Sequence, residues 1–421
     1  MIEAVAAAGK AASSGRMLHP NTENSTSDAS PAMAHDRFVF SPPPQPSYDY
    51  LPNNQVNIYF DAPAIYPAMD QLIATAQHSI KMDFFILGGS QAMQLAETLA
   101  RKVAAGVKVQ VIVDPSLGAL PTLHKQGKEL VAYLKAHGIE VLTADLTDLP
   151  PLLHKKEPFA IDHNKMIIVD DSRALIGGMN LANEFTTFHD VMVRVDGPAA
   201  GDLSRQLDYD WYFDAHPAEQ PHLEALAVKG IPASQPGLAT VRVNSTGINR
   251  QNQEAAILEN IQRATQSIDV AMLELGDDAL IDALIVARNR GVKIRVLVDP
   301  GDFDKLVPVI HKAPHGVVNA HGIQRLLQAG IDVHTFHTTD QQTILHEKAA
   351  IIDGNTLMVG STNWTTKALR YNSETSVEIH GSAVPAQAAA QFDRDWQTQS
   401  DPAQLPALWK RAASWVYNNY L

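Results

Sequence analysis

Short apolar runs alternate with longer stretches of helical period along most of the chain. Two of these runs, residues 109–113 and 294–298, are rich in β-branched side chains. Two others, residues 166–169 and 349–352, are apolar and end at residues that favour turns. Runs of this kind are typical of buried strands, and their alternation with helices is typical of layered α/β domains. The pattern therefore predicts an α/β fold.

A hairpin is expected directly after residues 349–352, at Asp353-Gly354-Asn355. If Gly354 and Asn355 form a two-residue loop, Asp353 pairs with Thr356 in an antiparallel ladder. Counting back along both strands, and in the same way in the first half of the chain, predicts four opposing pairs: Lys348 with Ser361, His346 with Asn363, Lys165 with Gly178, and His163 with Asn180. Imidazole, ammonium and carboxamide groups would then meet at one place in each half.

The second half of the chain repeats the first. Residues 106–115 (GVKVQVIVDP) are matched by residues 291–300 (GVKIRVLVDP), and Asp210-Trp211 is matched by Asp395-Trp396. The separation between matching positions is nearly constant. Self-similarity at a fixed offset indicates a duplicated structural unit, so each half is predicted to be one domain.

Composition marks the borders of these units. Residues 1–52 are rich in Ser, Asn, Ala and Pro, which predicts a flexible tail. Residues 216–238 contain four prolines and are expected to form a linker. The first lobe is then residues 53–215 and the second is residues 239–400, followed by a C-terminal aromatic segment, residues 401–421.

Composition also excludes several classes of function. The formal net charge of -13 argues against a general electrostatic hold on nucleic acid. The chain has no cysteine, which excludes disulfides, thiolate ligands and a cysteine nucleophile, and leaves the compartment open. No run of about 18 apolar residues is present, so we expect no transmembrane helix and a soluble or peripheral protein. We expect a monomer.

The most specific feature is a short signature, H-x-K-x4-D, that is present once in each half. Its copies are His163, Lys165 and Asp170 in the first half, and His346, Lys348 and Asp353 in the second. Each copy is followed at the same distance by a glycine-containing turn that ends in Asn180 or Asn363. One such match would be weak evidence, but two matched copies are strong evidence for a site.

The residue types of this signature suit a phosphodiester substrate. Strand alternation places His163 and Lys165 on one face and Asp170 on the other, so the aspartate is expected to support the site rather than react. Histidine supplies a nucleophilic nitrogen near neutral pH, while lysine and asparagine donate to charge on phosphoryl oxygens. A second histidine would serve as general acid for the leaving alkoxide.

Each half also contains a downstream acid, Asp190 or Glu374, at nearly the same distance from its histidine. We expect each acid to accept a hydrogen bond from the histidine of its own half and to orient that ring. No cluster of His, Asp and Glu stands at metal-ligand spacing, so neither a metal nor another cofactor is expected.

With H-x-K-x4-D, G-[GS]-x-N and a downstream acid in both halves, residues 53–400 resemble the phospholipase D superfamily. The resemblance implies two duplicated α-β-α sandwich lobes with one active site at their interface, a covalent phosphohistidine and no required metal. It implies that His163 is the nucleophile and His346 the acid, with the reverse left open. The implied catalytic residues are His163, Lys165, Asp170, Asp190, His346, Lys348, Asp353 and Glu374. The implied phosphate-binding residues are Gly178, Asn180, Ser361 and Asn363, with Gly178 offering a backbone N–H in place of the Ser361 hydroxyl.

The sequence around the first signature, residues 177–185 and 189–198, is similar to the cardiolipin synthase branch. In the second half, residues 360–364 and 372–374 are equally similar to bacterial nucleases of the superfamily. The leading hypothesis is a phospholipase D-type phosphodiesterase or phosphatidyltransferase that acts on glycerophospholipid, with water or an alcohol as acceptor. A nuclease of the same mechanism and a non-catalytic phosphate-binding scaffold are the alternatives; acidic balance and the lack of base-stacking aromatics in a basic groove count against the nuclease.

Three further features have a structural and a functional interpretation. His189 stands beside Asp190, but neighbouring strand residues face opposite ways, so no catalytic role is expected for it. Phe84-Phe85 is expected in the core rather than against an acyl chain. The C-terminal aromatic segment has Trp409, Trp415 and two tyrosines among basic residues. That mixture suits peripheral contact with a membrane interface and equally suits packing against the lobes.

Overall fold

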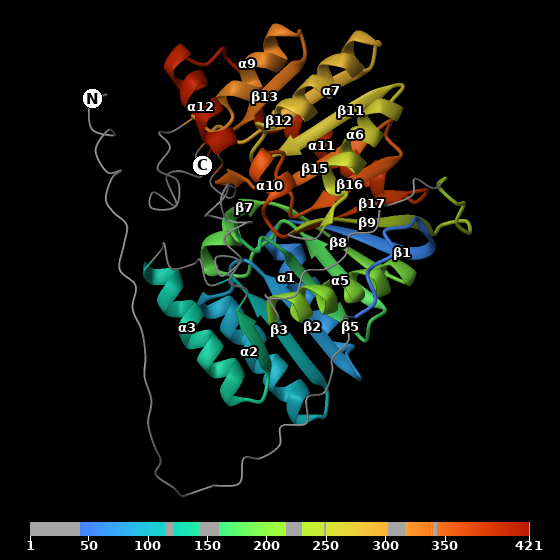
Figure 1. The fold of residues 1–421 in the computed structure, drawn as a ribbon, viewed down its shortest axis with the longest axis vertical. Helices are drawn as coiled ribbons and strands as arrows, with labels where there is room; N and C mark the ends of the chain where they lie inside the picture. Colours follow the sequence, from blue (N-terminus) through green and yellow to red (C-terminus); the bar gives the residue numbers. More distant parts are fainter. Residues whose placement is uncertain are drawn as a thin grey trace, which may run out of the picture. The chain divides into compact units, whose positions relative to one another are not determined.

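A computed structural model describes residues 43–114, 121–143, 160–215, 230–247, 250–301, 316–337, 339 and 343–420 (Figure 1). Residues 1–42 of the expected tail and residues 216–229 of the expected linker lie outside this description. Elements are named as in Figure 1.

The two repeats fold through matching series of strands and helices. The first repeat contains β1 (Leu51–Phe60), α1 (Asp61–Ala74), β2 (Ser79–Phe84), α2 (Gly89–Ala104), β3 (Lys108–Val113), α3 (Pro121–Ala136), β4 (Glu140–Thr143), β5 (Lys165–Val169), β6 (Arg173–Gly177), the 3-10 helix η3 (Asn183–Thr187), β7 (Phe188–His189), β8 (Val191–Asp196) and α5 (Pro198–Ala215). The second contains β9 (Ala239–Gly247), β10 (Arg250–Gln251), α6 (Gln253–Arg263), β11 (Ser267–Met272), α7 (Asp278–Asn289), β12 (Lys293–Val298), α9 (Ala320–Gln328), β13 (Asp332–Phe336), β14 (Ile344–Leu345), β15 (Lys348–Ile352), β16 (Thr356–Gly360), α10 (Thr366–Arg370), β17 (Glu374–His380), α11 (Val384–Thr398), β18 (Ser400–Pro402) and α12 (Leu408–Tyr420).

The strand order demonstrates the duplication. In the first repeat the order is β4-β3-β2-β5-β6-β8-β1, and in the second it is β13-β12-β11-β15-β16-β17-β9. The edge strands β1 and β9 pair antiparallel, with Leu51 opposite Val241, so these strands form one continuous sheet, while β7 and β14 form a separate two-stranded sheet. The α/β fold class predicted from the pattern is confirmed.

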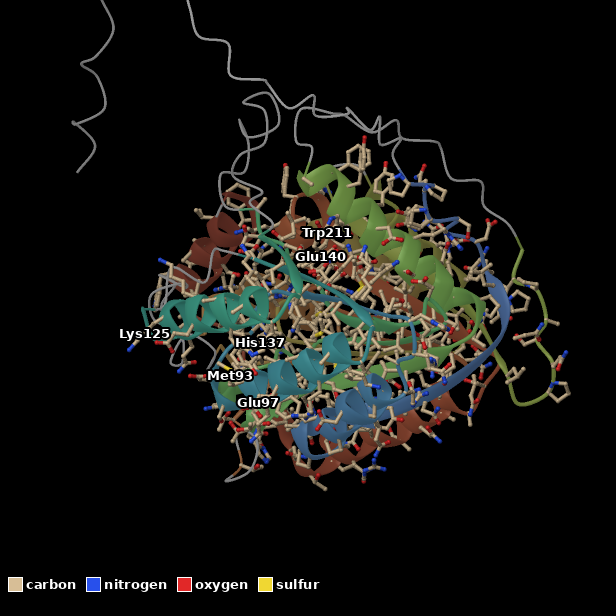
Figure 2. The ribbon with its side chains drawn as sticks, turned by 90° about the horizontal axis from the view of Figure 1, so that it is seen from below. Met93, Glu97, Lys125, His137, Glu140 and Trp211 are labelled. Carbon is tan, nitrogen blue, oxygen red and sulfur yellow. The ribbon has the colours of Figure 1, made fainter. Side chains whose placement is uncertain are left out.

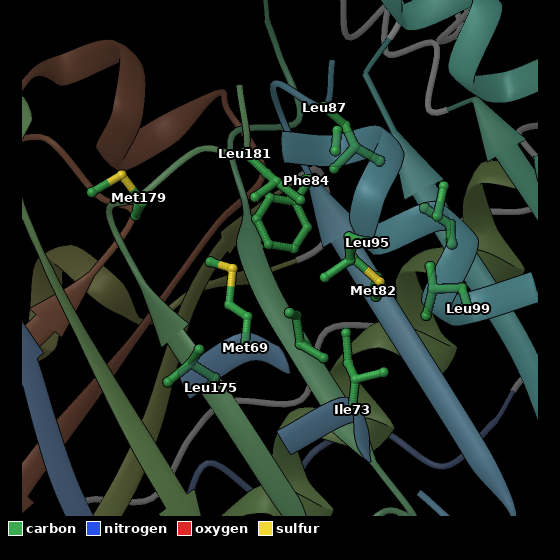
Figure 3. Packing of buried hydrophobic residues seen from close by; sticks show 14 of the residues in the cluster. Met69, Ile73, Met82, Phe84, Leu87, Leu95, Leu99, Leu175, Met179 and Leu181 are labelled. Atoms are coloured by element: carbon green, nitrogen blue, oxygen red, sulfur yellow. The ribbon is translucent and has the colours of Figure 1, made fainter. Parts of the chain in front are cut away.

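Each half of the sheet is covered on both faces because its central strands are apolar on both faces. In β5, Ile167 and Val169 belong to one core while Met166 and Ile168 belong to another. The first core is packed under α1 and α2, and Figure 3 shows Met69, Met82 and Phe84 within it. Helices α2 and α3 contact each other (Figure 2).

The core on the opposite face extends across both repeats. It contains Val193 of β8 and Leu203 of α5 together with Val241, Leu357 and Phe392 of the second repeat. Burial of apolar surface stabilises by about 25 cal/mol for each Å² removed from water. Separation of the repeats would expose this shared surface, so the position of one repeat fixes that of the other.

The packed structure begins earlier than predicted. Tyr48 and Tyr50 are buried, and β1 begins at Leu51. The Ser47 hydroxyl and the Tyr48 N–H both donate to the Asp202 carboxylate of α5. The expected tail boundary at residue 52 is therefore wrong, because two aromatic side chains just before it are buried in the fold.

Glycines end matching helices in the two repeats. Gly106 follows α2 with φ +89°, and Gly291 follows α7 with φ +96°. Only glycine adopts these values without steric cost. Each glycine reverses the chain from the helix into a parallel strand, which explains why both repeats have a Gly-Val-Lys sequence there.

No helix within the described residues combines the length and apolarity needed to cross a bilayer. In the same part of the chain, no group of three or more His, Asp or Glu side chains is arranged to hold a metal ion.

Candidate active site at the junction of the repeats

Both signature hairpins have three-residue loops, and the predicted two-residue loops are wrong. Ile352 pairs with Thr356, and Val169 pairs with Arg173. Every opposing pair predicted from the two-residue loop is therefore displaced by one residue: Lys348 with Ser361, His346 with Asn363, Lys165 with Gly178, and His163 with Asn180. The displacement arises because Asp170 and Asp353 leave the ladder, with φ +49° and +51°.

The signature aspartates bind backbone at the far end of the hairpins. Asp353 accepts hydrogen bonds from the N–H groups of Thr265, Gln266 and Ser267 at the start of β11. Asp170 accepts the equivalent N–H groups, from Gln77 to Ser79, before β2. Each aspartate stands five positions after its lysine, or about 16 Å along an extended strand. These contacts favour a supporting role for both aspartates, which stays a prediction.

Each histidine is positioned by backbone pairing with the other repeat. The His163 N–H donates to the Ser373 carbonyl (2.8 Å), and the His346 N–H donates to the His189 carbonyl (2.8 Å). Strand β14, just before His346, pairs parallel with β7, and Asp162 forms the matching bridge to Ser373. The segment before each histidine therefore lies beside the segment before the acid of the opposite repeat.

This pairing makes the acid-histidine contacts cross between repeats. His163 Nδ1 lies 3.0 Å from both carboxylate oxygens of Glu374, and His346 Nδ1 lies 2.6 Å from Asp190 Oδ2. The expectation that each acid orients the histidine of its own half is wrong. Its cause is the parallel pairing across the junction, which brings the opposite acid to each ring.

The two acids are held differently. Glu374 accepts from the Ser361 hydroxyl (2.6 Å) and from the Asn372 amide (3.2 Å). The shorter Asp190 side chain accepts from its neighbour's N–H, that of Val191 (2.8 Å), and lies so close to Gly178 that a Cβ there would overlap Oδ1. Serine therefore accompanies glutamate in one repeat, and glycine accompanies aspartate in the other.

Two predicted phosphate ligands have hydrogen-bond partners within the protein. The Gly178 N–H donates to the Val191 carbonyl (3.1 Å) and continues the strand ladder. The Ser361 hydroxyl donates to Glu374, and its N–H donates to the Thr375 carbonyl (3.0 Å). The Gly178 N–H and the Ser361 hydroxyl, which were expected to bind a phosphate, are thus engaged by the Val191 carbonyl and by Glu374.

The two asparagines differ in their partners. Asn180 Oδ1 accepts from the Ile86 N–H (3.1 Å), which turns the amide nitrogen the other way. Asn363 Nδ2 donates to Glu274 Oε2 (3.2 Å). Glu274 and Ile86 occupy matching positions, because each backbone carbonyl accepts the N–H of the residue after the asparagine. Sequence reasoning missed Glu274; alignment of the repeats would have revealed a carboxylate where the first repeat has isoleucine.

The signature lysines are buried beside the histidines. Lys165 Nζ donates to the His163 carbonyl (2.5 Å), and Lys348 Nζ donates to the His346 carbonyl (2.6 Å). Burial lowers the pKa of Lys165 to about 7 and that of Lys348 to about 8, although Glu374 raises the pKa of both and Asp190 does so as well. Lysine and acid charges from both repeats therefore act on one site.

Burial favours the neutral form of both histidines before substrate binds. Burial, together with Lys165 and Lys348, lowers the pKa of His163 well below its usual value. Burial and Lys348 also lower the pKa of His346 to about 3, against the opposite effect of Asp190. Burial raises the pKa of Glu374 to about 8. With Nδ1 engaged by an acid, each neutral ring has Nε2 as its remaining reactive nitrogen.

Aromatic side chains stand against both rings. Phe84 lies in the core as predicted, but Phe85 is only partly buried and meets the His163 ring edge-on, with centroids 5.0 Å apart. On the other side, Phe188 lies 5.5 Å from the His346 ring. Phe85 packs against the edge of the same core, so it lies between that core and the His163 ring.

His189 joins the second repeat to the first below His346. It is fully buried, with Nδ1 2.9 Å from Asp61 and Nε2 3.1 Å from Asp395 and 3.6 Å from Glu347. Burial alone would lower its pKa, but the bonds to Asp395 and Asp61 raise the pKa well above the usual value. Both of its ring nitrogens are therefore engaged by these acids.

Known proteins resemble this chain in sequence and in fold. The family model described as cardiolipin synthase, PLD-like domain, matches residues 69–211 and 257–396, the two repeats. The chain is 24% identical over 361 residues to a cardiolipin synthase of Clostridium perfringens (82% of this chain, 71% of the relative). It is 23% identical over 356 residues to cardiolipin synthase A of Pseudomonas aeruginosa (82% and 68%). A crystal structure of phosphatidylserine synthase from Haemophilus influenzae superposes with TM-score 0.63 at 13% identity, covering 83% of this chain and 87% of that one.

These matches confirm the resemblance identified from the paired signatures, and the fold with it. They also confirm the class of enzyme, a phospholipase D-like phosphodiesterase or phosphatidyltransferase. Since the family model covers both repeats and most of the chain, the protein belongs to the cardiolipin synthase, phospholipase D-like domain family.

Proposed function

We propose that the chain transfers or hydrolyses the phosphatidyl group of a glycerophospholipid through a covalent phosphohistidine, in the manner of a cardiolipin synthase. The observation that carries this proposal is the crossed pair of contacts, His163 with Glu374 and His346 with Asp190. Two imidazoles, each oriented at Nδ1 by an acid, supply the nucleophile in its neutral form and the general acid, which enters the step protonated at Nε2. The relatives named as cardiolipin synthases support the choice of substrate.

In the first step, His163 Nε2 attacks phosphorus and forms a P–N bond while the P–O bond to the leaving alcohol breaks. His346 donates a proton to that alkoxide. In the second step, His346 takes a proton from water or an acceptor alcohol, whose oxygen attacks phosphorus and releases His163. Lys165, Lys348 and the Asn180 amide stabilise charge on the phosphoryl oxygens. The reverse assignment of the two histidines fits the same atoms.

A product assay tests this proposal. Purified protein is incubated with phosphatidylglycerol alone, and with phosphatidylcholine with and without added glycerol. Cardiolipin and free glycerol from the first incubation identify transfer, and phosphatidic acid identifies hydrolysis. His163→Asn and His346→Asn are each expected to abolish turnover, while His137→Asn, at an exposed histidine directly after α3, is the matched control (Figure 2). Near-normal rates in both site variants would refute the mechanism.

The alternatives predict other outcomes. Digestion of single-stranded DNA without lipid turnover would identify a nuclease. Inactivity of the wild type on both classes, together with unchanged phosphate-ester binding by His163→Ala, would identify a scaffold. EDTA is expected to leave turnover intact, and a loss that added metal restores would contradict the metal-free reaction.

A further inference from the structure

Exposed apolar side chains gather at the C-terminal end of the described chain. Leu405, Leu408, Trp409, Trp415 and Val416 are all exposed, Leu408 by 74% and Trp409 by 55%. They make up most of the large exposed hydrophobic side chains in the described residues, and the others, Ile231 and Val286, are isolated from them in sequence. We call these five residues the C-terminal patch. Single exposed apolar residues are ordinary, whereas a cluster marks a surface that is covered in function.

The patch stands on a helix that is fixed to the fold. Ser414, fully buried, donates to the Val318 carbonyl (2.8 Å) and accepts from the His321 N–H (3.0 Å) at the start of α9. Helix α12 contacts α9 and α10, and Figure 1 shows it beside α9. One side of α12 is therefore buried against the second repeat, and the patch residues remain at the surface on a rigid support.

Charge and residue type indicate the chemistry of the partner. Residues 405–421 contain Lys410 and Arg411 and no acid, in a chain with a formal net charge of -13. Lys410 Nζ lies 5.8 Å from the centroid of the Trp409 ring. Tryptophan prefers the boundary between lipid headgroups and acyl chains, and basic residues are attracted to an anionic leaflet. The segment therefore matches the surface of an anionic phospholipid bilayer.

Helix α12 lies beside elements that adjoin the site. Helix α10, which α12 contacts, begins at Thr366, three residues after Asn363. Lys410 also approaches Gly316, which lies against Pro300 and Gly301 just after β12. There Asp299 accepts the N–H of Leu345, the neighbour of His346. Contact of the patch with a membrane would thus bring the His346 side of the site near the lipid surface.

We infer that the C-terminal patch binds the surface of an anionic phospholipid bilayer and thereby holds the active site at the membrane that contains its substrate. The binding part of this inference stands on the patch itself. The role in holding substrate rests on the proposed function, because only a lipid-directed enzyme benefits from that location.

Vesicle co-sedimentation tests the binding. The probes are phosphatidylcholine vesicles with and without phosphatidylglycerol, and the patch variant carries Leu408→Ala and Trp409→Ala. We expect wild type to bind the anionic vesicles, and the patch variant to bind them at least about tenfold more weakly, equivalent to about 1.4 kcal/mol. Val286→Ala, at a residue of α7 that is 56% exposed, is the matched control and should bind as wild type does. Equal thermal unfolding of all three proteins excludes a folding defect.

Turnover separates docking from catalysis. On a short-chain phospholipid below its micelle concentration, the patch variant should retain the wild-type rate, while on vesicles its rate should fall in step with its binding. Wild type that fails to bind anionic vesicles, or a patch variant that binds them as tightly, would overturn the inference. A wild-type dimer that the patch variant converts to monomer, without vesicle binding, would identify a second copy as the partner and overturn it too. If neither protein turns over short-chain lipid but the binding difference holds, the proposed function fails and the docking stands.

Discussion

The imidazole of His163, in the first repeat, is oriented by the carboxylate of Glu374, in the second, at 3.0 Å. The partner contact, from Asp190 to His346, runs in the opposite direction across the junction. Each reactive ring thus depends on a carboxylate that lies far away in the sequence. The predictions below depend on this arrangement and on the hairpins and buried charges around it.

Glu374→Gln and Asp190→Asn are each expected to lower kcat by roughly 10²–10⁴-fold, because the histidine loses the acid that fixes its tautomer. Downfield proton NMR signals of the histidine Nδ1–H groups show which ring is affected. Glu374→Gln should remove the signal of His163 and leave that of His346. The opposite result would mean that acids and histidines pair within repeats.

Gly178→Ala is expected to destabilise the fold by about 1–3 kcal/mol and to reduce turnover, because the new methyl group meets Asp190. Ser361→Gly removes one hydrogen bond to Glu374 and should cost about 1 kcal/mol, with most turnover retained. Urea unfolding and kcat of both variants provide the comparison. A larger loss of turnover in Ser361→Gly than in Gly178→Ala would support direct phosphate binding by the Ser361 hydroxyl.

Asp353→Ala should cost about 1–3 kcal/mol of stability, because three backbone N–H groups lose their acceptor, while kcat stays within about twofold of wild type. Slight burial raises the pKa of Asp353, but the bonds from Ser267 and its neighbours outweigh this and lower the pKa below its usual value. Its stabilisation is therefore present above about pH 4 and is lost as pH falls through the lowered value. Acid titration of unfolding, with wild type in parallel, measures this difference. Loss of turnover at unchanged stability would instead place the aspartate in catalysis.

His189→Gln is expected to destabilise the fold by about 3 kcal/mol near pH 6, because it leaves the buried acids Asp395 and Glu347, and the partly buried Asp61, without their cation. Since the pKa of His189 is raised in the folded state, its stabilisation is complete below about pH 6.5 and is lost as pH rises through the raised value. The difference in Tm between wild type and variant should therefore shrink in alkaline buffer. A difference that grows with pH would show that the ring is neutral in the fold.

Local pattern was sufficient to predict the strands and the reactive residues. The runs at residues 166–169 and 349–352 are buried on both faces, as a central strand of a covered sheet requires, and apolar composition alone reveals that. The signatures likewise identify their histidines and lysines, because the residue types are rare at that spacing.

Long-range contacts determined what the pattern did not predict. The turn at Asp353 depends on N–H groups of Thr265 to Ser267, which no local rule relates to the hairpin. The exchange of acids depends on the pairing of β7 with β14, which equal sequence spacing from His163 and His346 cannot distinguish from pairing within repeats. Such contacts are set by how the halves assemble.

The exchanged acids have a consequence for the history of the chain. A duplicated gene usually leaves one copy free to decay, since the other preserves the function. Here the loss of Glu374 would leave His163, encoded in the other copy, without the acid that orients it. The loss of Asp190 would do the same to His346. Each copy therefore supplies an acid that the histidine of the other copy requires, so we expect both copies to be retained and to evolve together.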